Sequence, residues 1–197
     1  MRHAPLAEGL LRLGCVQFGD FTLKSGKQSP IYLDLRRLIG DPATLGQAAE
    51  AYVELLQPLE FDRIAGLPYA ALPIAAAISL RGGWPMIYPR KEIKDYGTQA
   101  AVEGPYAAGE TIAVVDDLIT TGGSKFEGIK KLEAAGLAVR DVVVLVDRGA
   151  GAKETLAERG LALYAVFRLE ELLAYWQESG VIELGDYART IEFLQQG

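Results

Sequence analysis

The sequence predicts an α/β protein with a central, mostly parallel β-sheet that is flanked by helices. Short apolar runs rich in β-branched residues, at 112–115 and 139–146, are separated by amphipathic stretches of helical spacing. The connections are short, as is typical of repeated strand–helix units with right-handed crossovers. Half of the 197 residues are hydrophobic, which is enough for a sizeable core. We expect one domain over 1–197, with an N-terminal helix and hood region at 1–40 and an α/β core at 41–197.

The first forty residues differ from this alternating pattern. Residues 4–14 are expected to form a helix with leucines along one stripe, and Gly14 is its stop signal. Apolar alternation on both sides of 24–27 predicts a β-hairpin, or two short strands with a basic tip, within 16–36. We interpret this hairpin as a small hood that covers the main sheet.

Strands and helices then alternate to the end of the chain. Asp41 and Pro42 suit the N-cap and first position of a helix that ends near Leu56. The further expected elements are a strand at 61–66, a turn at 67–73, a helix at 74–80, strands at 85–89 and 112–115, a helix at 125–135, a strand at 139–146, a helix at 152–159, a strand at 161–167, and helices at 170–178 and 186–195. Tyr175 and Trp176 are expected to pack the C-terminal segment.

Composition excludes several classes of function. The net charge of −6 argues against a broad nucleic-acid-binding surface. No apolar run approaches the length of a membrane span, and no signal-like block is seen at the N-terminus. The single cysteine, Cys15, suits a reducing compartment, so we expect a cytoplasmic protein in which this thiol is buried. The only histidine is His3, which disfavours imidazole catalysis and histidine-based metal sites.

The most informative stretch is 111–124, Thr-Ile-Ala-Val-Val-Asp-Asp-Leu-Ile-Thr-Thr-Gly-Gly-Ser. We expect a buried strand to end at Asp116 and Asp117, followed by a loop of small residues and a helix. The free N–H groups at a helix N-terminus bind phosphate, and glycines allow its close approach. Two carboxylates can accept hydrogen bonds from sugar hydroxyls. The stretch therefore favours a sugar-phosphate site, although the alternative is an ordinary turn in which the acids cap the helix. The Walker and dinucleotide patterns are absent.

A second stretch, 90–104, is long, begins with charges and lacks a clear strand or helix pattern. Such a loop in a compact domain is usually a lid or disordered. Arg90, Lys91 and Lys94 place three cations on it, and it follows a strand of the same expected sheet. Ligands of parallel sheets bind beyond the carboxyl ends of the strands, which favours a lid over the alternative of a solvated charged loop.

Three shorter stretches carry little information alone. Lys24 within 21–34 also suits a surface hairpin, and 67–70 suits a proline-rich loop. Arg148, after the strongest predicted strand, could bind a planar carboxylate in a bidentate pair or belong to a surface ion pair with Asp147.

Taken together, these stretches carry a family resemblance. Residues 114–124 resemble the phosphoribosyl-diphosphate (PRPP) binding motif of type I phosphoribosyltransferases. The pattern Arg-Lys-x-x-Lys-Asp-Tyr-Gly at 90–97 is similar to the catalytic loop of orotate phosphoribosyltransferases, especially the transferase half of bifunctional UMP synthases. Residues 21–34, 67–70 and 147–149 resemble further motifs of that family, in the same order.

The resemblance implies the type I phosphoribosyltransferase fold and a glycosyltransferase (pentosyltransferase) activity. The enzyme would transfer the 5-phosphoribosyl group from PRPP to orotate in pyrimidine biosynthesis, giving orotidine 5′-monophosphate and diphosphate. It would use Mg²⁺, which would bridge substrate oxygens with few direct protein ligands. It would be a homodimer in which the lid at 90–104 closes over the active site of the neighbouring subunit. No nucleic-acid or membrane partner is expected.

The resemblance also implies roles for individual residues, with none assigned as a metal ligand. The catalytic residues would be Lys94, Asp116 and Asp117. The PRPP-binding residues would be Lys24, Tyr69, Ala70, Arg90, Lys91, Lys94, Tyr96, Asp116, Asp117, Leu118, Ile119, Thr120, Thr121, Gly122, Gly123 and Ser124. The orotate-binding residues would be Lys24, Tyr32, Leu33, Thr120 and Arg148.

Two positions depart from the common bacterial pattern of the family, because Ala70 replaces a lysine and Tyr96 replaces a histidine. Two other functions remain as alternatives. One is a phosphoribosyltransferase for another base. The other is a regulator that senses PRPP on the same fold and binds RNA or DNA, which the acidic charge and the retained cations at 90–94 disfavour.

Overall fold

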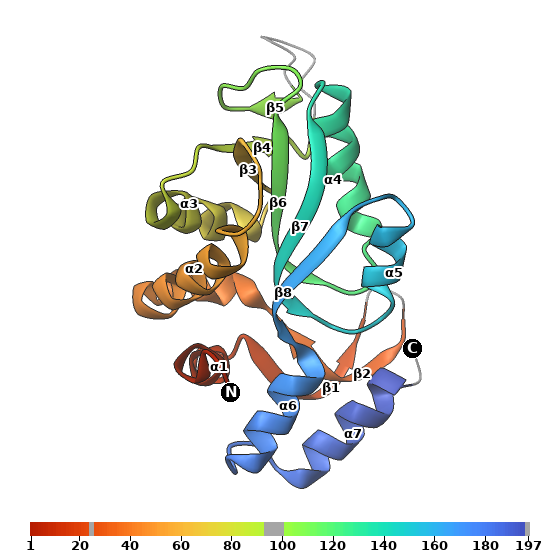
Figure 1. Ribbon diagram of the computed structural model, residues 1–197. Helices are drawn as coiled ribbons and strands as arrows, with labels where there is room; N and C mark the ends of the chain where they lie inside the picture. Colours follow the sequence, from red (N-terminus) through yellow and green to blue (C-terminus); the bar gives the residue numbers. More distant parts are fainter. Residues whose placement is uncertain (24–25, 93–100, 196–197) are drawn as a thin grey trace.

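The computed structural model describes residues 1–23, 26–92 and 101–195, apart from the side chain of Ser124. In this part of the chain, a six-stranded sheet has the order β5–β4–β3–β6–β7–β8 (Figure 1). Five strands run parallel, and β5 pairs antiparallel with β4 at one edge. The strands are β3 (Arg63–Gly66), β4 (Met86–Pro89), β5 (Val102–Glu103), β6 (Thr111–Ile119), β7 (Ala138–Asp147) and β8 (Ala162–Arg168). The predicted α/β fold is confirmed.

Helices cover both faces of this sheet (Figure 1). One face packs against α1 (Ala4–Arg12), α2 (Pro42–Leu56), α3 (Ala71–Gly82) and α6 (Leu169–Glu178), and the other against α4 (Gly123–Ala134) and α5 (Ala152–Ala157). The central strand β6 shows why both faces of the sheet are covered. Ala113 and Val115 belong to the first core, whereas Ile112 and Val114 belong to the second, since successive side chains of a strand point to opposite faces.

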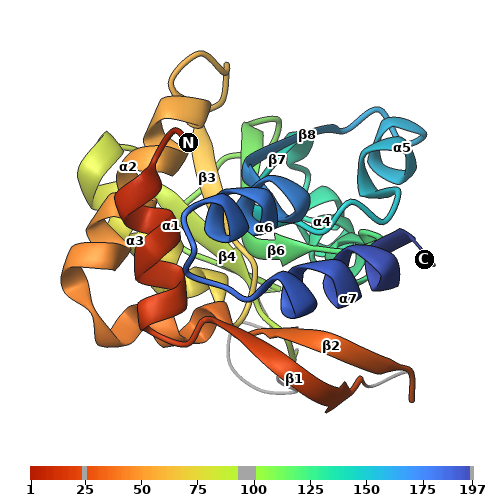
Figure 2. The ribbon, with the colours of Figure 1, turned by 90° about the horizontal axis from the view of Figure 1, so that it is seen from below.

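The N-terminal hairpin is formed by β1 (Val16–Thr22) and β2 (Gln28–Leu33), followed by a 3₁₀ helix, η1 (Leu35–Gly40). Seen from below, the hairpin lies beside α7 (Leu184–Gln195), which packs against β2 (Figure 2). Lys27 Nζ lies 4.9 Å from the ring centroid of Phe193 on that helix. The predicted hairpin is therefore confirmed.

Two aromatic residues of α6 join this helix to α1. Trp176 is buried and donates from Nε1 to the carbonyl oxygen of Ala7 at 3.2 Å, and the hydroxyl of Tyr175 donates to Glu8 at 2.8 Å. Cys15 is buried as expected. Within the described residues, no helix combines the length and the apolar character needed to cross a bilayer.

Three predictions about the sheet and α3 were wrong. Strand β6 does not end at the aspartates but continues through them to Ile119, because it stays paired with β7. Helix α3 begins at Ala71 rather than at 74, so Pro73 falls in its first turn, where a missing N–H breaks no intrahelical bond. The stretch 90–104, expected to lack regular structure, contains the two-residue strand β5.

Asp41 is the N-cap residue of α2 as predicted, but without a capping side-chain hydrogen bond. Its carboxylate instead accepts hydrogen bonds from Thr44 Oγ1 at 2.5 Å and from the guanidinium of Arg12 at 2.7 Å. The side chain of Asp41 therefore links α1 to α2 through these hydrogen bonds instead of capping α2.

Candidate active site

Two adjoining pockets lie where β3, β4 and β6 end. The first, of about 400 Å³, is lined by Leu67, Pro68, Tyr69, Ala70, Pro89, Arg90, Lys91, Asp116, Asp117, Lys125, Glu127, Gly128 and Lys131. The second, of about 380 Å³, is lined by Tyr32, Leu33, Asp34, Leu35, Arg36, Tyr69, Ala70 and Asp117. Tyr69, Ala70 and Asp117 belong to both, so the pockets meet along these three residues. We call them the cation-rich pocket and the hairpin pocket.

Asp116 is the most enclosed acid of the site. Its Oδ1 accepts the N–H of Asp117 at 2.9 Å, and its Oδ2 forms an ion pair with Lys125 Nζ. The side chains of Asp116 and Lys125 are only 8% and 11% exposed. Burial raises the pKa of Asp116 from 3.8 to about 7, which Lys125 opposes and the charge of Asp117 reinforces.

The backbone at Asp116 is fixed by a hydrogen bond from α2, which packs on the opposite face of the sheet from α4. The buried Tyr52 of α2 donates its hydroxyl to the carbonyl oxygen of Asp116 at 2.6 Å. Burial, followed by the charges of Asp117 and Asp116, raises the pKa of Tyr52 well above 10, so the phenol stays a donor. Asp117 is itself half-buried.

The loop after β3 supplies the wall shared by both pockets. Leu67 N donates to Val115 O at 3.0 Å, which holds the loop against β6, and the peptide bond between Pro68 and Tyr69 is cis. A Cβ at Gly66 would lie 2.8 Å from the Cβ of Ala75, so only glycine lets α3 pack this close. Tyr69 is 63% exposed, and Lys91 Nζ lies 5.1 Å from its ring centroid.

The two ends of the 90–104 stretch are held together and fixed to α4. Arg90 N donates to Ala101 O at 2.8 Å, and the Arg90 guanidinium pairs with Glu103. Lys131 Nζ donates to the carbonyl oxygens of Arg90 at 3.0 Å and Lys91 at 2.8 Å, and to Glu127 at 3.0 Å. These bonds use the three donors of the ammonium group.

The loop after β6 does not line either pocket with its described side chains. Leu118 and Ile119 pack into the two cores instead. Thr120 is half-buried, and Thr121 and Gly123 are exposed. Gly122 has φ +84° and precedes α4, which has no side-chain N-cap. Lys125 N donates to Gly122 O at 2.9 Å, which leaves the N–H groups before it, at the very start of α4, for other acceptors.

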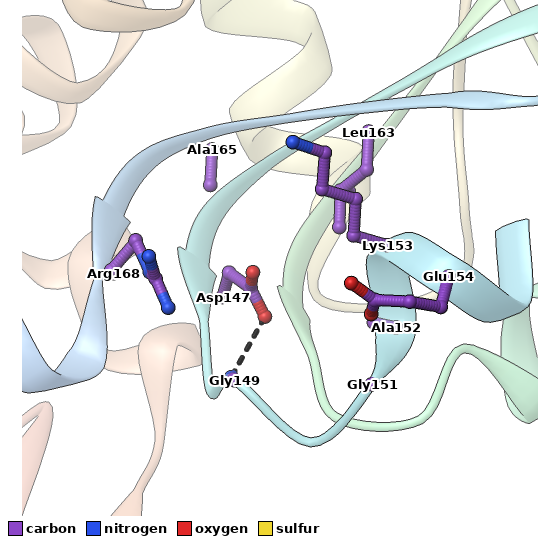
Figure 3. A pocket seen from close by; sticks show the side chains of 9 residues that line it. All are labelled: Asp147, Gly149, Gly151, Ala152, Lys153, Glu154, Leu163, Ala165 and Arg168. Carbon is purple, nitrogen blue, oxygen red and sulfur yellow. Dashed lines mark hydrogen bonds between the residues drawn. The ribbon is translucent and has the colours of Figure 1, made fainter. Parts of the chain in front are cut away.

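Arg148 lies in the loop between β7 and α5. Figure 3 shows a separate pocket of about 420 Å³ beside this loop, with Asp147 and Gly149 in its lining. Asp147 Oδ1 accepts the N–H of Gly149 at 2.9 Å, and Arg148 N donates to Ile119 O at 3.0 Å. Arg148 Nε is buried without a hydrogen-bond partner in the described structure, and burial lowers the pKa of its guanidinium. Arg148 is absent from the residues that line the three pockets named here.

The structure thus brings together about half of the predicted site residues that it describes, whereas those of the loop at 118–123 and Arg148 line neither of the two adjoining pockets. Those lining the two adjoining pockets are Tyr32, Leu33, Tyr69, Ala70, Arg90, Lys91, Asp116 and Asp117. The predictions for Lys24, Lys94, Tyr96 and the side chain of Ser124 lie outside the described residues.

Sequence reasoning missed Lys125, Lys131, Asp34 and Arg36, all of which line the two pockets. Lys125 directly follows the motif at 114–124, and Asp34 ends the stretch 21–34, which were the available signals. The others depend on contacts between distant elements.

The described part of the site offers few ligands for a metal ion of its own. The described residues contain no group of three or more His, Cys, Asp or Glu side chains that could hold an ion. One of the two adjacent carboxylates is already paired with Lys125. Mg²⁺ in such a site is usually bound through phosphate oxygens of the substrate and a few carboxylates, with waters completing its shell. The residues therefore suit a metal carried by the substrate.

No protein-family model matches the chain. An orotate phosphoribosyltransferase of Methanoculleus marisnigri is 41% identical over 169 residues, which are 86% of this chain and 97% of that protein. The chain spans 39% and 40% of the length of the longer relatives that it also matches.

Solved structures of proteins with the same names are also similar to this chain. UMP synthase of Leishmania donovani superposes with a TM-score of 0.91 at 49% identity, covering 98% of this chain and 42% of that one. Orotate phosphoribosyltransferase of Mycobacterium tuberculosis H37Rv, solved in complex with PRPP, superposes with a TM-score of 0.73 at 30% identity, covering 87% of this chain and 99% of that one.

Proposed function

Because this chain belongs to the orotate phosphoribosyltransferase family, we propose that it transfers the 5-phosphoribosyl group of PRPP to orotate, releasing diphosphate. The observation that carries this proposal is the pair of pockets that meet at Asp117. A substrate with an anionic leaving group on one side of a ribose and a base on the other needs two such compartments. The related enzyme solved with PRPP supports the same substrate for this chain.

The cation-rich pocket would take the diphosphate. Arg90, Lys91, Lys125 and Lys131 contribute positive charge there, and the exposed loop at Tyr69 and Ala70 offers backbone groups. Arg90 is already paired with Glu103, so Lys91 is the cation of the 90–91 pair that is more available to substrate. Asp116 and Asp117 would accept hydrogen bonds from the ribose hydroxyls.

The 5′-phosphate would bind at the start of α4. The loop from Thr120 to Ser124 leads into that helix, whose first N–H groups have no side-chain cap. Unpaired N–H groups and the positive end of the helix dipole favour a phosphate at such a place. Leu118 and Ile119 would contribute through the backbone, since their side chains pack into the cores.

Orotate would occupy the hairpin pocket beside Tyr32 and Leu33. The buried Nε of Arg148 lacks an acceptor in the described structure, and a carboxylate is the acceptor that suits a guanidinium best. The bond from Arg148 N to Ile119 O brings this arginine next to Thr120, another of the residues assigned to orotate.

In the reaction, a ring nitrogen of orotate attacks the anomeric carbon as diphosphate leaves. Positive charge develops on the ribose and negative charge on the diphosphate, so fixed charges in a water-excluding site stabilise the transition state. Asp116 and Asp117 would favour the cationic ribose, and Arg90, Lys91 and Lys94 would neutralise the departing diphosphate. Mg²⁺, when bound, supplies further charge neutralisation at the diphosphate.

We also propose a cytoplasmic homodimer of one-domain subunits in which the 90–104 stretch covers the site of the neighbouring subunit. Mixing two inactive variants tests this arrangement, one with Lys94→Ala and one with Asp116→Asn and Asp117→Asn. If the sites are shared, random dimers should regain about a quarter of wild-type activity, since half of them carry one intact site. No recovery after confirmed subunit exchange would contradict the shared site.

The activity is tested by the ultraviolet absorbance of orotate with and without PRPP and Mg²⁺. We expect consumption of orotate only when both are present. A panel of purine and pyrimidine bases run alongside tests the choice of base, and consumption of another base in place of orotate would overturn it. Salt-sensitive binding of RNA or DNA without any turnover would favour a regulator instead.

A further inference from the structure

Lys125 is a cation that the family resemblance leaves without a role. It is the third residue of α4, lines the cation-rich pocket and forms an ion pair with Asp116. Both side chains are nearly buried, at 11% and 8% exposed. The contact crosses the turn between β6 and α4, so it joins the strand and the helix that form the centre of the site.

The position is unfavourable for a lysine if stability alone is considered. The first turn of a helix carries partial positive charge, so acids are stabilising there and cations are not. Burying an ammonium and a carboxylate also costs solvation that their attraction often fails to recover. A lysine at this place is therefore a local conflict of the kind that proteins retain at functional sites.

The pair leaves Asp116 fixed but still able to accept hydrogen bonds. One oxygen accepts the N–H of Asp117 at 2.9 Å, and the other meets Lys125. A carboxylate offers about four acceptor positions, so capacity remains for a sugar hydroxyl. At the same time, the ammonium cancels one of the two adjacent negative charges that would repel a phosphorylated substrate.

We propose that Lys125 is a positioning residue for PRPP: it holds the Asp116 carboxylate toward the ribose and neutralises it against the substrate's phosphates. This inference rests on the proposed function and deepens it. Lys125 acts on the sugar-phosphate substrate through Asp116 and not on the base, whose pocket it does not line.

The test compares Lys125→Met, Lys125→Arg and a control, Lys130→Met. Methionine keeps the length of the stem without charge, arginine restores the charge, and Lys130 is exposed on the same helix. Binding of PRPP is measured by calorimetry, kcat and both KM values by orotate absorbance, and folding by thermal melting.

For Lys125→Met we expect PRPP affinity to fall at least about tenfold, the size of one lost charge interaction, while the KM for orotate stays within about twofold. Lys125→Arg should recover most of the affinity, and Lys130→Met should match the wild type. Unchanged PRPP affinity in Lys125→Met would overturn the proposal. So would equal losses for both substrates with a lower melting temperature, because that pattern indicates a structural role only.

The same measurements separate the inference from the proposed function. A wild-type protein that binds PRPP but consumes no orotate would refute the activity, while calorimetry on the variants still decides the role of Lys125. A wild-type protein that fails to bind PRPP would overturn both.

Discussion

The stability of the protein should depend on pH through Asp116, and an Asp116→Asn variant isolates that dependence. Burial raises the pKa of this carboxyl from 3.8 to about 7 in the folded state, despite the nearby Lys125. The folded state therefore holds the proton more tightly than the unfolded state. The resulting stabilisation is complete below about pH 4 and is lost as the pH rises through about 7.

The expected size follows from the two pKa values. Between about pH 5.5 and about pH 8, a carboxyl with a folded pKa near 7 and an unfolded pKa near 4 loses about 2 kcal/mol of stabilisation. Asparagine has the same shape and does not titrate. The free energy of unfolding of Asp116→Asn, minus that of the wild type, should therefore rise by about 2 kcal/mol across this range.

Urea unfolding followed by tryptophan fluorescence measures this difference, since Trp176 is buried in the folded protein. The control is Glu133→Gln, an exposed side chain of α4, for which the difference should stay within about 0.5 kcal/mol at every pH. A flat difference for Asp116→Asn would refute the raised pKa. A difference that falls with pH would mean that the attraction of Lys125 outweighs burial.

Three further predictions concern single residues. Arg148→Lys should raise the Kd for orotate at least about tenfold without changing PRPP affinity, since lysine cannot pair in the bidentate manner; calorimetry with each ligand checks this, and equal losses for both would contradict it. Tyr52→Phe should lower the free energy of unfolding by about 1–2 kcal/mol in urea titrations, because Asp116 O loses the 2.6 Å bond; an unchanged midpoint and slope would count against this contact. Cys15 is buried with its pKa raised to about 11, so a thiol reagent should modify it only upon unfolding; rapid labelling of the folded protein would disprove this.

Most of the fold could be predicted because its elements are long and periodic. The runs of β-branched residues predicted the strands, and the helical spacing of apolar residues predicted the helices between them. The end of β6 was missed because two adjacent acids resemble the end of a buried strand, whereas pairing of Leu118 with Val146 and Ile119 with Asp147 extends it. Strand β5 was missed because two residues, Val102 and Glu103, are too few to show a period.

The sequence predicted several residues that line the site but not the interactions between their side chains. Motif resemblance identified Asp116, Asp117, Tyr69 and Lys91, which line one pocket in the structure. The ion pair of Asp116 with Lys125 could not be predicted, because it depends on how α4 packs against β6. The same holds for the bonds from Lys131 to the backbone of Arg90 and Lys91, which join residues about forty positions apart. The roles assigned to these residues stay predictions.

The continuation of β6 explains how the chain places two adjacent acids at the end of a buried strand. Neighbouring side chains of a strand point to opposite faces, so the two carboxylates are not forced side by side. Asp116 falls on the side of α4, where Lys125 neutralises it. Asp117 falls at the junction of the cation-rich and hairpin pockets. The extension of β6 by its pairing with β7 is therefore what allows one acid to be enclosed and the other to remain open to both pockets.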